Sequence, residues 1–218
     1  MELKDRVCRT LLGKNEFDPL KAAKAVLSVN FHRDGQLFIH RFQLLNDSSF
    51  SMEDKNYRAK ALVDLIMSIE CSLKSICVST SPSNIDAGAL YKKLKKKGHR
   101  HKSLYDMALT YSNEMGFILP PYPEEVLKDL ESLGLVNARY SQEIWAIQIE
   151  GPFAPSQGLL SETIHSPEWR DLLVNLAVTF SKVAIESHNI NIQPYAAVIE
   201  NRGSYEIELE KLKVARKS

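Results

Sequence analysis

The amino-acid sequence predicts a mainly α-helical fold, arranged as an up-down helical bundle with N-terminal and C-terminal extensions. Apolar residues recur every three or four positions along several segments, which is the spacing of one face of an α-helix. Clusters of glycine, proline, serine and asparagine separate these segments and are typical of helix ends and loops. Of the 218 residues, 44% are hydrophobic and 25% are charged, a balance typical of a folded globular chain.

The N-terminal region predicts two helices. A helical stripe over residues 2–12 is closed by Gly13, a residue type common just after helix ends. Asp18 and Pro19 are typical of an N-cap followed by proline at the first helical position, and they predict a helix over residues 20–29.

The next segment leaves two interpretations open. Asp34 followed by Gly35 favours a tight turn between strands, which predicts a hairpin. Phe38, Phe42 and Leu45 lie at helical spacing and predict a helix after Gly35 instead. The helix is the favoured interpretation.

The longest apolar stripe predicts a central helix that runs to about Val78. Ser51 and Asp54 have the Ser-x-x-acid form of a capping box at its start. A wide apolar face follows at helical spacing: Ala61, Leu62, Leu65, Ile66, Ile69, Leu73 and Ile76.

Later helices are predicted over residues 87–97, 103–115 and 124–133, and a strong final helix begins at Pro167. A loop-like run over 141–167 precedes that final helix. The tail from Gln193 combines a short strand at 196–199 with a charged, helical end. The predicted organisation is an N-terminal extension packed on the bundle (1–50), the bundle itself (51–190) and a C-terminal tail (191–218).

Charge and cysteine usage exclude several classes of protein. The formal net charge is +1, so an electrostatic partner must be bound by a local patch. No window approaches the roughly 18 apolar residues of a membrane span, and we expect a soluble, cytoplasmic protein. Cys8, Cys71 and Cys77 form no Cys-x-x-Cys pair, so we expect free thiols, no metal site and no cofactor.

Three segments carry polar residues in combinations that are informative when taken together. Residues 68–76 read Ser-Ile-Glu-Cys-Ser-Leu-Lys-Ser-Ile, with Glu70 one helical turn before Lys74. Residues 98–104 read Gly-His-Arg-His-Lys-Ser-Leu, and residues 137–141 read Asn-Ala-Arg-Tyr-Ser.

In this order the three segments resemble the HEPN superfamily. The first is similar to the family's helix with Glu followed by Leu-Lys, and the second to its histidine-hydrophobe segment, with His99 or His101 as the matching histidine. The third resembles the late Arg-Tyr-Pro of many members, with Ser141 in place of proline. The resemblance covers residues 57–187.

The resemblance implies a bundle of four to five core helices that commonly forms a homodimer. Many family members are metal-independent endoribonucleases of toxin–antitoxin and phage-defence systems. Others have lost the nuclease residues and bind nucleotides or partner proteins. The nuclease members carry an arginine, a short spacer and then a histidine near the start of a late helix.

This chain departs from that nuclease pattern. After Arg139 the next histidine is His165, which is too distant, and His165 precedes Arg170 in reversed order. Arg33 and His40 have a suitable spacing but lie far upstream, and we interpret them as a chance match. If the chain is an enzyme, the candidate catalytic residues are His101, Arg139, His165 and Arg170.

The densest charge in the chain is a basic segment, comprising Lys92, Lys93, Lys95, Lys96, Lys97, His99, Arg100 and Lys102. Such a cluster can bind the phosphates of RNA or of a nucleotide. Its affinity would depend on the salt concentration and would not distinguish between base sequences. The alternative is a solvated helix face without a ligand. Few aromatic residues interleave with these cations, so base stacking is poorly supported.

Glu70 and Lys74 share a face of the most apolar predicted helix, where an unpaired charge would be costly. We therefore interpret them as a structural ion pair, joined by Arg139 or His101, and not as catalytic groups. With Tyr140 they form a predicted structural polar cluster.

Three functions follow as hypotheses. The leading one is a HEPN-like protein, non-catalytic or diverged, that binds RNA, a nucleotide or an antitoxin-like partner protein. The second is a metal-independent endoribonuclease toxin. The third is a helical dimerisation or scaffold protein, in which the lysines serve solubility.

Overall fold

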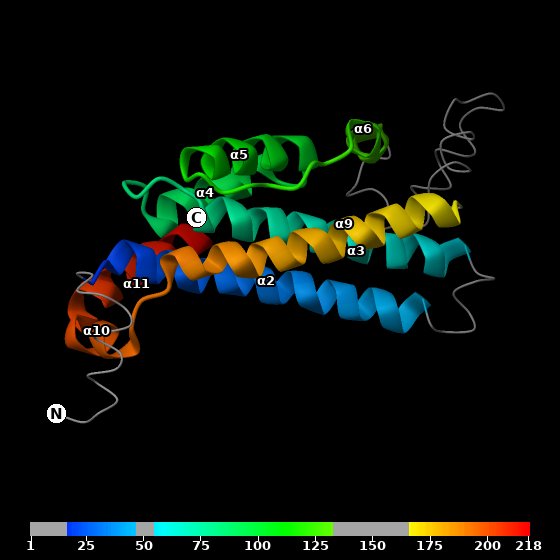
Figure 1. Cartoon of the computed structure of the whole chain (residues 1–218). Helices are drawn as coiled ribbons and strands as arrows, with labels where there is room; N and C mark the ends of the chain where they lie inside the picture. Colours follow the sequence, from blue (N-terminus) through cyan, green and yellow to red (C-terminus); the bar gives the residue numbers. More distant parts are fainter. Residues whose placement is uncertain (1–16, 47–54, 133–165) are drawn as a thin grey trace, which may run out of the picture.

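The computed structural model describes residues 17–46, 55–132 and 166–218, and within these ranges its regular structure is entirely helical. Labelled as in Figure 1, the helices are α2 (Pro19–Asn46), α3 (Lys55–Ser79), α4 (Ala87–Lys97), α5 (His101–Glu114), α6 (Glu124–Ser132), α9 (Pro167–His188), the 3₁₀ turn η2 (Asn189–Asn191), α10 (Tyr195–Glu200) and α11 (Arg202–Lys217). The predicted mainly helical class is confirmed. None of these helices combines the length and the apolar character needed to cross a lipid bilayer.

The body of the molecule is made of α2, α3 and α9, which lie side by side (Figure 1). The start of α2 meets the end of α3, where Ser28 Oγ lies 2.7 Å from Ser79 Oγ. The end of α2 meets the first half of α3, where Arg41 pairs with Asp64, so the two helices are antiparallel. Asn191, just beyond α9, donates a hydrogen bond to the Ser79 carbonyl, so α9 and α3 end together.

α3 is the central helix of this arrangement. It contacts α2 and α9, and on another side it contacts α5. A helix with neighbours on most sides buries apolar residues around most of its circumference. Its hydrophobic side chains that are at most 1% exposed include Leu65, Ile69, Leu73, Ile76 and Val78. The predicted capping box at Ser51 lies outside the described residues.

Small residues line the contact between α2 and α3. A Cβ atom at Gly35 would lie 3.3 Å from the Ser68 carbonyl oxygen and 3.4 Å from Ser72 Oγ. Further along, the hydroxyl of Ser28 lies 2.9 Å from that of Ser75, so these buried polar groups satisfy one another. This packing lets the two helix backbones approach closely.

The hairpin interpretation at Asp34 and Gly35 is therefore wrong, because α2 passes through both residues without a break. The helix predicted over 20–29 and the helix predicted after Gly35 are one element. Glycine in a helix interior costs about 1 kcal/mol relative to alanine. Here that cost is offset by the close contact that Gly35 permits with α3.

The short strand predicted at 196–199 is also wrong, because these residues lie in α10. The two alanines in this segment favour a helix, and Pro194 precedes the first helical residue. The charged end of the tail forms α11, as predicted. α11 packs against α4, and a Cβ atom at Gly88 would lie 2.8 Å from the Lys211 carbonyl oxygen.

The remaining helices match their predicted ranges with ends shifted by at most two residues. Asp86 caps the N-terminus of α4, and Gly98, with φ of 60°, ends it. Ser166 caps α9, which begins at Pro167 as predicted. The predicted helix over 2–12 and most of the predicted loop over 141–167 lie outside the described residues.

Candidate functional site

The carboxylate of Glu70, on α3, is 1% exposed and has two partners. Its Oε1 lies 2.5 Å from Lys74 Nζ, one turn along the same helix, and its Oε2 lies 2.8 Å from His99 Nδ1. His99 directly follows Gly98, in the turn between α4 and α5. We call Glu70, Lys74 and His99 the polar cluster. It attaches the α4–α5 turn to the central helix.

The polar cluster differs from the predicted one in its third member. His101 was a candidate partner of Glu70, but its Nδ1 lies 3.0 Å from the Tyr122 hydroxyl instead. The histidine bonded to Glu70 is His99. The other predicted members, Arg139 and Tyr140, lie outside the described residues.

His101 is an interior residue with an exposed fraction of 0%. Burial lowers its pKa from 6.5 to about 4, and the nearby Glu70 charge offsets only part of this effect. Its Nε2 atom has no hydrogen-bond partner among the described residues. The imidazole is therefore neutral at pH 7 and packed under Tyr122, an arrangement that suits a core residue and denies it contact with a substrate.

The other catalytic candidates do not form a described site. Arg170 lies in the first turn of α9, and its Nε is 3.9 Å from Asp171 Oδ1. No described hydrogen bond or ion pair joins Arg170 to His101. His165 and Arg139 lie outside the described residues. His40, on α2, is exposed, and so is Arg33.

The cations of the basic segment lie on the second half of α4, in the turn and at the start of α5, and four of them line one groove. We call its cations, Lys92, Lys93, Lys95, Lys96, Lys97, Arg100 and Lys102, the basic surface. Of these seven cations, only Lys102 has a carboxylate of a described residue at ion-pair distance, with its Nζ 3.4 Å from Asp106 Oδ1. Lys93 Nζ donates to the Tyr111 hydroxyl at 2.8 Å and Lys97 Nζ to Ser103 Oγ at 2.7 Å, and both of these partners are neutral. Most of this positive charge therefore has no neutralising carboxylate within the described part of the chain.

A groove of about 520 Å³ lies on this surface between α4 and α5. Its cations are Lys93, Lys97, Arg100 and Lys102, and its carboxylates are those of Asp106 and Glu131. Hydroxyl groups of Ser103, Thr110 and Tyr111 complete the polar lining. The Thr110 hydroxyl donates to the Asp106 carbonyl, so the hydroxyl protons left for a ligand are those of Ser103 and Tyr111. Four cations and these two donors against two carboxylates make the groove suited to phosphate oxygens.

A structural role accounts for part of the charge. The last turn of α4 holds Lys95, Lys96 and Lys97, where cations favourably face the negative end of the helix dipole. Lys102, the second residue of α5, pairs with Asp106 one turn along the helix. Neither explanation applies to Arg100, the N-cap residue of α5. Positive charge at a helix N-terminus is mildly unfavourable, so the helix dipole does not account for this arginine.

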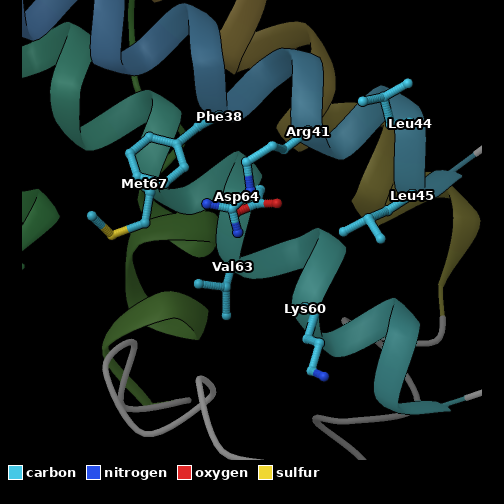
Figure 2. Close-up of a pocket in the computed structure, with 8 residues that line it drawn as sticks. All are labelled: Phe38, Arg41, Leu44, Leu45, Lys60, Val63, Asp64 and Met67. Atoms are coloured by element: carbon cyan, nitrogen blue, oxygen red, sulfur yellow. The ribbon is translucent and has the colours of Figure 1, made fainter.

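Sequence reasoning missed the hydroxyl groups of the groove, because their place beside the lysines depends on how α5 packs on α4. It also missed the ion pair between the buried Asp64 and the exposed Arg41, whose charged atoms lie 3.1 Å apart (Figure 2). The available signal for Asp64 was the one that singled out Glu70, a carboxylate within the apolar stripe of α3.

The chain matches no protein-family profile, no curated protein and no solved structure. The described residues contain no group of three or more histidine, cysteine or acidic side chains that could hold a metal ion.

Proposed function

We propose that this chain is a non-catalytic, HEPN-like helical protein that binds RNA through the basic surface. The observation that carries the proposal is the number of cations on that surface that have no carboxylate partner among the described residues. In a protein of net charge +1, so concentrated a positive charge produces a strong local field. Polyanions are the ligands that such a field attracts.

The lining of the groove favours a polymer over a single nucleotide. Tyr111 is the aromatic residue of the described lining, and it is buried beneath Lys93, whose Nζ lies 5.3 Å from the ring centroid. A ring covered in this way cannot stack on a base. The groove therefore offers phosphate contacts without base contacts, and binding by successive phosphates is typical of sequence-independent RNA recognition.

The burial of His101 supports the non-catalytic part of the proposal. Metal-free RNA cleavage needs a base that reaches the 2′-hydroxyl and a cation beside the phosphate. His101 is a neutral core residue, so it does not supply that base. We assign the polar cluster the role of holding the α4–α5 turn, and with it the basic surface, in place.

The test is the salt dependence of RNA binding, measured by fluorescence anisotropy with a labelled single-stranded oligonucleotide. Each phosphate contact contributes about 0.7 to the slope of log affinity against log salt. We expect the triple variant Lys93→Gln, Lys97→Gln and Arg100→Gln to lower the slope by about 2 and to weaken binding severalfold at low salt.

A control variant removes the same charge elsewhere: Lys60→Gln, Lys182→Gln and Arg202→Gln, all exposed and on α3, α9 and α11. It should bind RNA with the wild-type slope. Equal losses in both triple variants, or no binding by the wild type at low salt, would refute the proposal. Full displacement of the RNA by a mononucleotide at matched phosphate concentration would refute the preference for a polymer.

A further inference from the structure

Large hydrophobic side chains are exposed to solvent in the segment that forms α10 and α11. Of the eleven exposed large hydrophobic side chains among the described residues, five lie between Ile192 and Val214. α10 and α11 lie at the end of the molecule where α2 begins and α9 ends (Figure 1). Single exposed hydrophobic residues are common on soluble proteins, whereas a group of them on neighbouring helices indicates a contact surface.

α11 has two sides of different character. One side, with Glu208, Leu212 and Ala215, is buried, and the helix packs against α4 and α2. The other side carries Ile207, which is 60% exposed, and Val214, which is 56% exposed. Residues seven apart lie on one face of a helix, so these two side chains form an apolar stripe along the exposed side.

The charge on the exposed side of α11 changes sign along the helix. Glu206 and Glu210 come first, with side chains 57% and 63% exposed, and Lys213 and Lys217 follow. The helix dipole acts within the terminal turns, and the first turn of α11 contains no acidic residue. The dipole therefore does not account for the two carboxylates.

These charges have only weak contacts within the helix. Glu206 Oε1 lies 2.6 Å from Arg202 Nε, and Glu210 Oε2 lies 3.1 Å from Lys213 Nζ. Exposed ion pairs of this kind contribute little to stability, because water screens them and long side chains must be held in one geometry. The same side chains are therefore free to pair with charges on another molecule.

We propose that α11 binds α11 of a second copy of this chain in an antiparallel, two-fold arrangement. The acidic residues of one copy then lie beside the basic residues of the other, and Ile207 and Val214 of both copies form the apolar contact. A parallel arrangement would place like charges side by side, which is unfavourable.

The exposed side of α11 is complementary to itself, which favours a second copy over an unrelated partner. A two-fold interface presents the same surface from both molecules, so each charged part must meet a part of opposite charge. A single pair of 16-residue helices is a small interface, so the dimer should form reversibly at micromolar concentrations. α11 lies outside residues 57–187, which carry the HEPN resemblance, and outside the basic surface, so RNA binding can fail without affecting the proposal.

The test is sedimentation velocity of the full-length wild-type chain over a range of micromolar concentrations. We expect a reversible equilibrium between monomer and dimer. Val214→Glu should weaken dimerisation by about tenfold, because it places a charge in the apolar contact. Ile185→Glu is the matched control, at a hydrophobic position of α9 that is 42% exposed, and it should leave the equilibrium unchanged.

An exchange of charges tests the antiparallel pairing. One variant carries Glu206→Lys and Glu210→Lys, and a second carries Lys213→Glu and Lys217→Glu. Each variant alone should dimerise about tenfold more weakly than the wild type, because like charges then face each other. An equimolar mixture of the two variants should associate about as well as the wild type, which misfolded variants could not do.

Several results would overturn the proposal. One is a wild-type chain that stays monomeric at the highest concentration. Another is a dimer that Ile185→Glu weakens as much as Val214→Glu does, because the contact would then lie elsewhere. Charge variants that dimerise like the wild type, or that show no recovery when mixed, would also contradict it.

Discussion

The buried imidazole of His101 predicts a specific loss of stability in mild acid. Its pKa falls from 6.5 to about 4 on folding because the native structure buries it. Below pH 6.5 the unfolded chain therefore takes up a proton that the native chain does not. Stability from the neutral imidazole is fully present above pH 6.5 and is lost as pH falls towards 4.

The size of this effect follows from the shift. Each pKa unit corresponds to about 1.36 kcal/mol, so the free energy of unfolding should fall by about 3 kcal/mol between pH 7 and pH 4 through this residue. His101 is fully buried, so solvent screening does not reduce the figure. His32 and His188, whose pKa values are also lowered by burial, contribute in the same direction.

The assay is urea unfolding at a series of pH values for the wild type and for His101→Gln, which cannot titrate in this range. The difference between their free energies of unfolding removes the contributions of His32 and His188. That difference should shrink by about 3 kcal/mol from pH 7 to pH 4. His40→Gln, at an exposed position of α2, should follow the wild-type curve. A pH-independent difference for His101→Gln would refute the reasoning.

Three further predictions concern packing, the polar cluster and a buried thiol. Gly35→Val should destabilise the fold by about 1–3 kcal/mol in urea unfolding because its side chain meets α3, whereas Gly203→Ala, where a Cβ atom has open space, should not destabilise it. Glu70→Gln should lower the free energy of unfolding by about 3 kcal/mol because it breaks the buried pair with Lys74. In a double-mutant cycle, Glu70→Gln combined with Lys74→Met should lose less than the sum of the two single losses; strictly additive losses would show that the pair does not interact. Cys77, whose pKa is raised by burial to about 12, should resist iodoacetamide at pH 8 until the chain is unfolded, and rapid native alkylation seen by mass spectrometry would contradict its burial.

The helices that sequence alone predicted well are those whose ends carry local signals. α4 ends at Gly98, because glycine readily adopts the positive φ that ends a helix. α9 begins at Pro167, because proline after a serine cap has the backbone geometry of a first helical residue. α2 was harder, since Gly35 is a turn residue by local preference and a helical residue only because α3 packs against it.

In the candidate site, too, the features set by local sequence were predicted and those set by tertiary packing were not. The cations of the basic surface were visible in the sequence because their spacing and density need no tertiary information. The choice between His99 and His101 was not, because the two lie two residues apart and only the packing of α5 buries one of them. The ion pair of Asp64 likewise depends on which α2 residue reaches it.

The measurement that tests the RNA-binding proposal most directly is an NMR titration of the wild-type chain with a single-stranded oligonucleotide at low salt. Binding on the basic surface predicts that the shifted backbone amides cluster in residues 92–111, and that the shifts disappear when the salt concentration is raised. Shifts centred on α2 or α9, or shifts that persist unchanged in high salt, would contradict it.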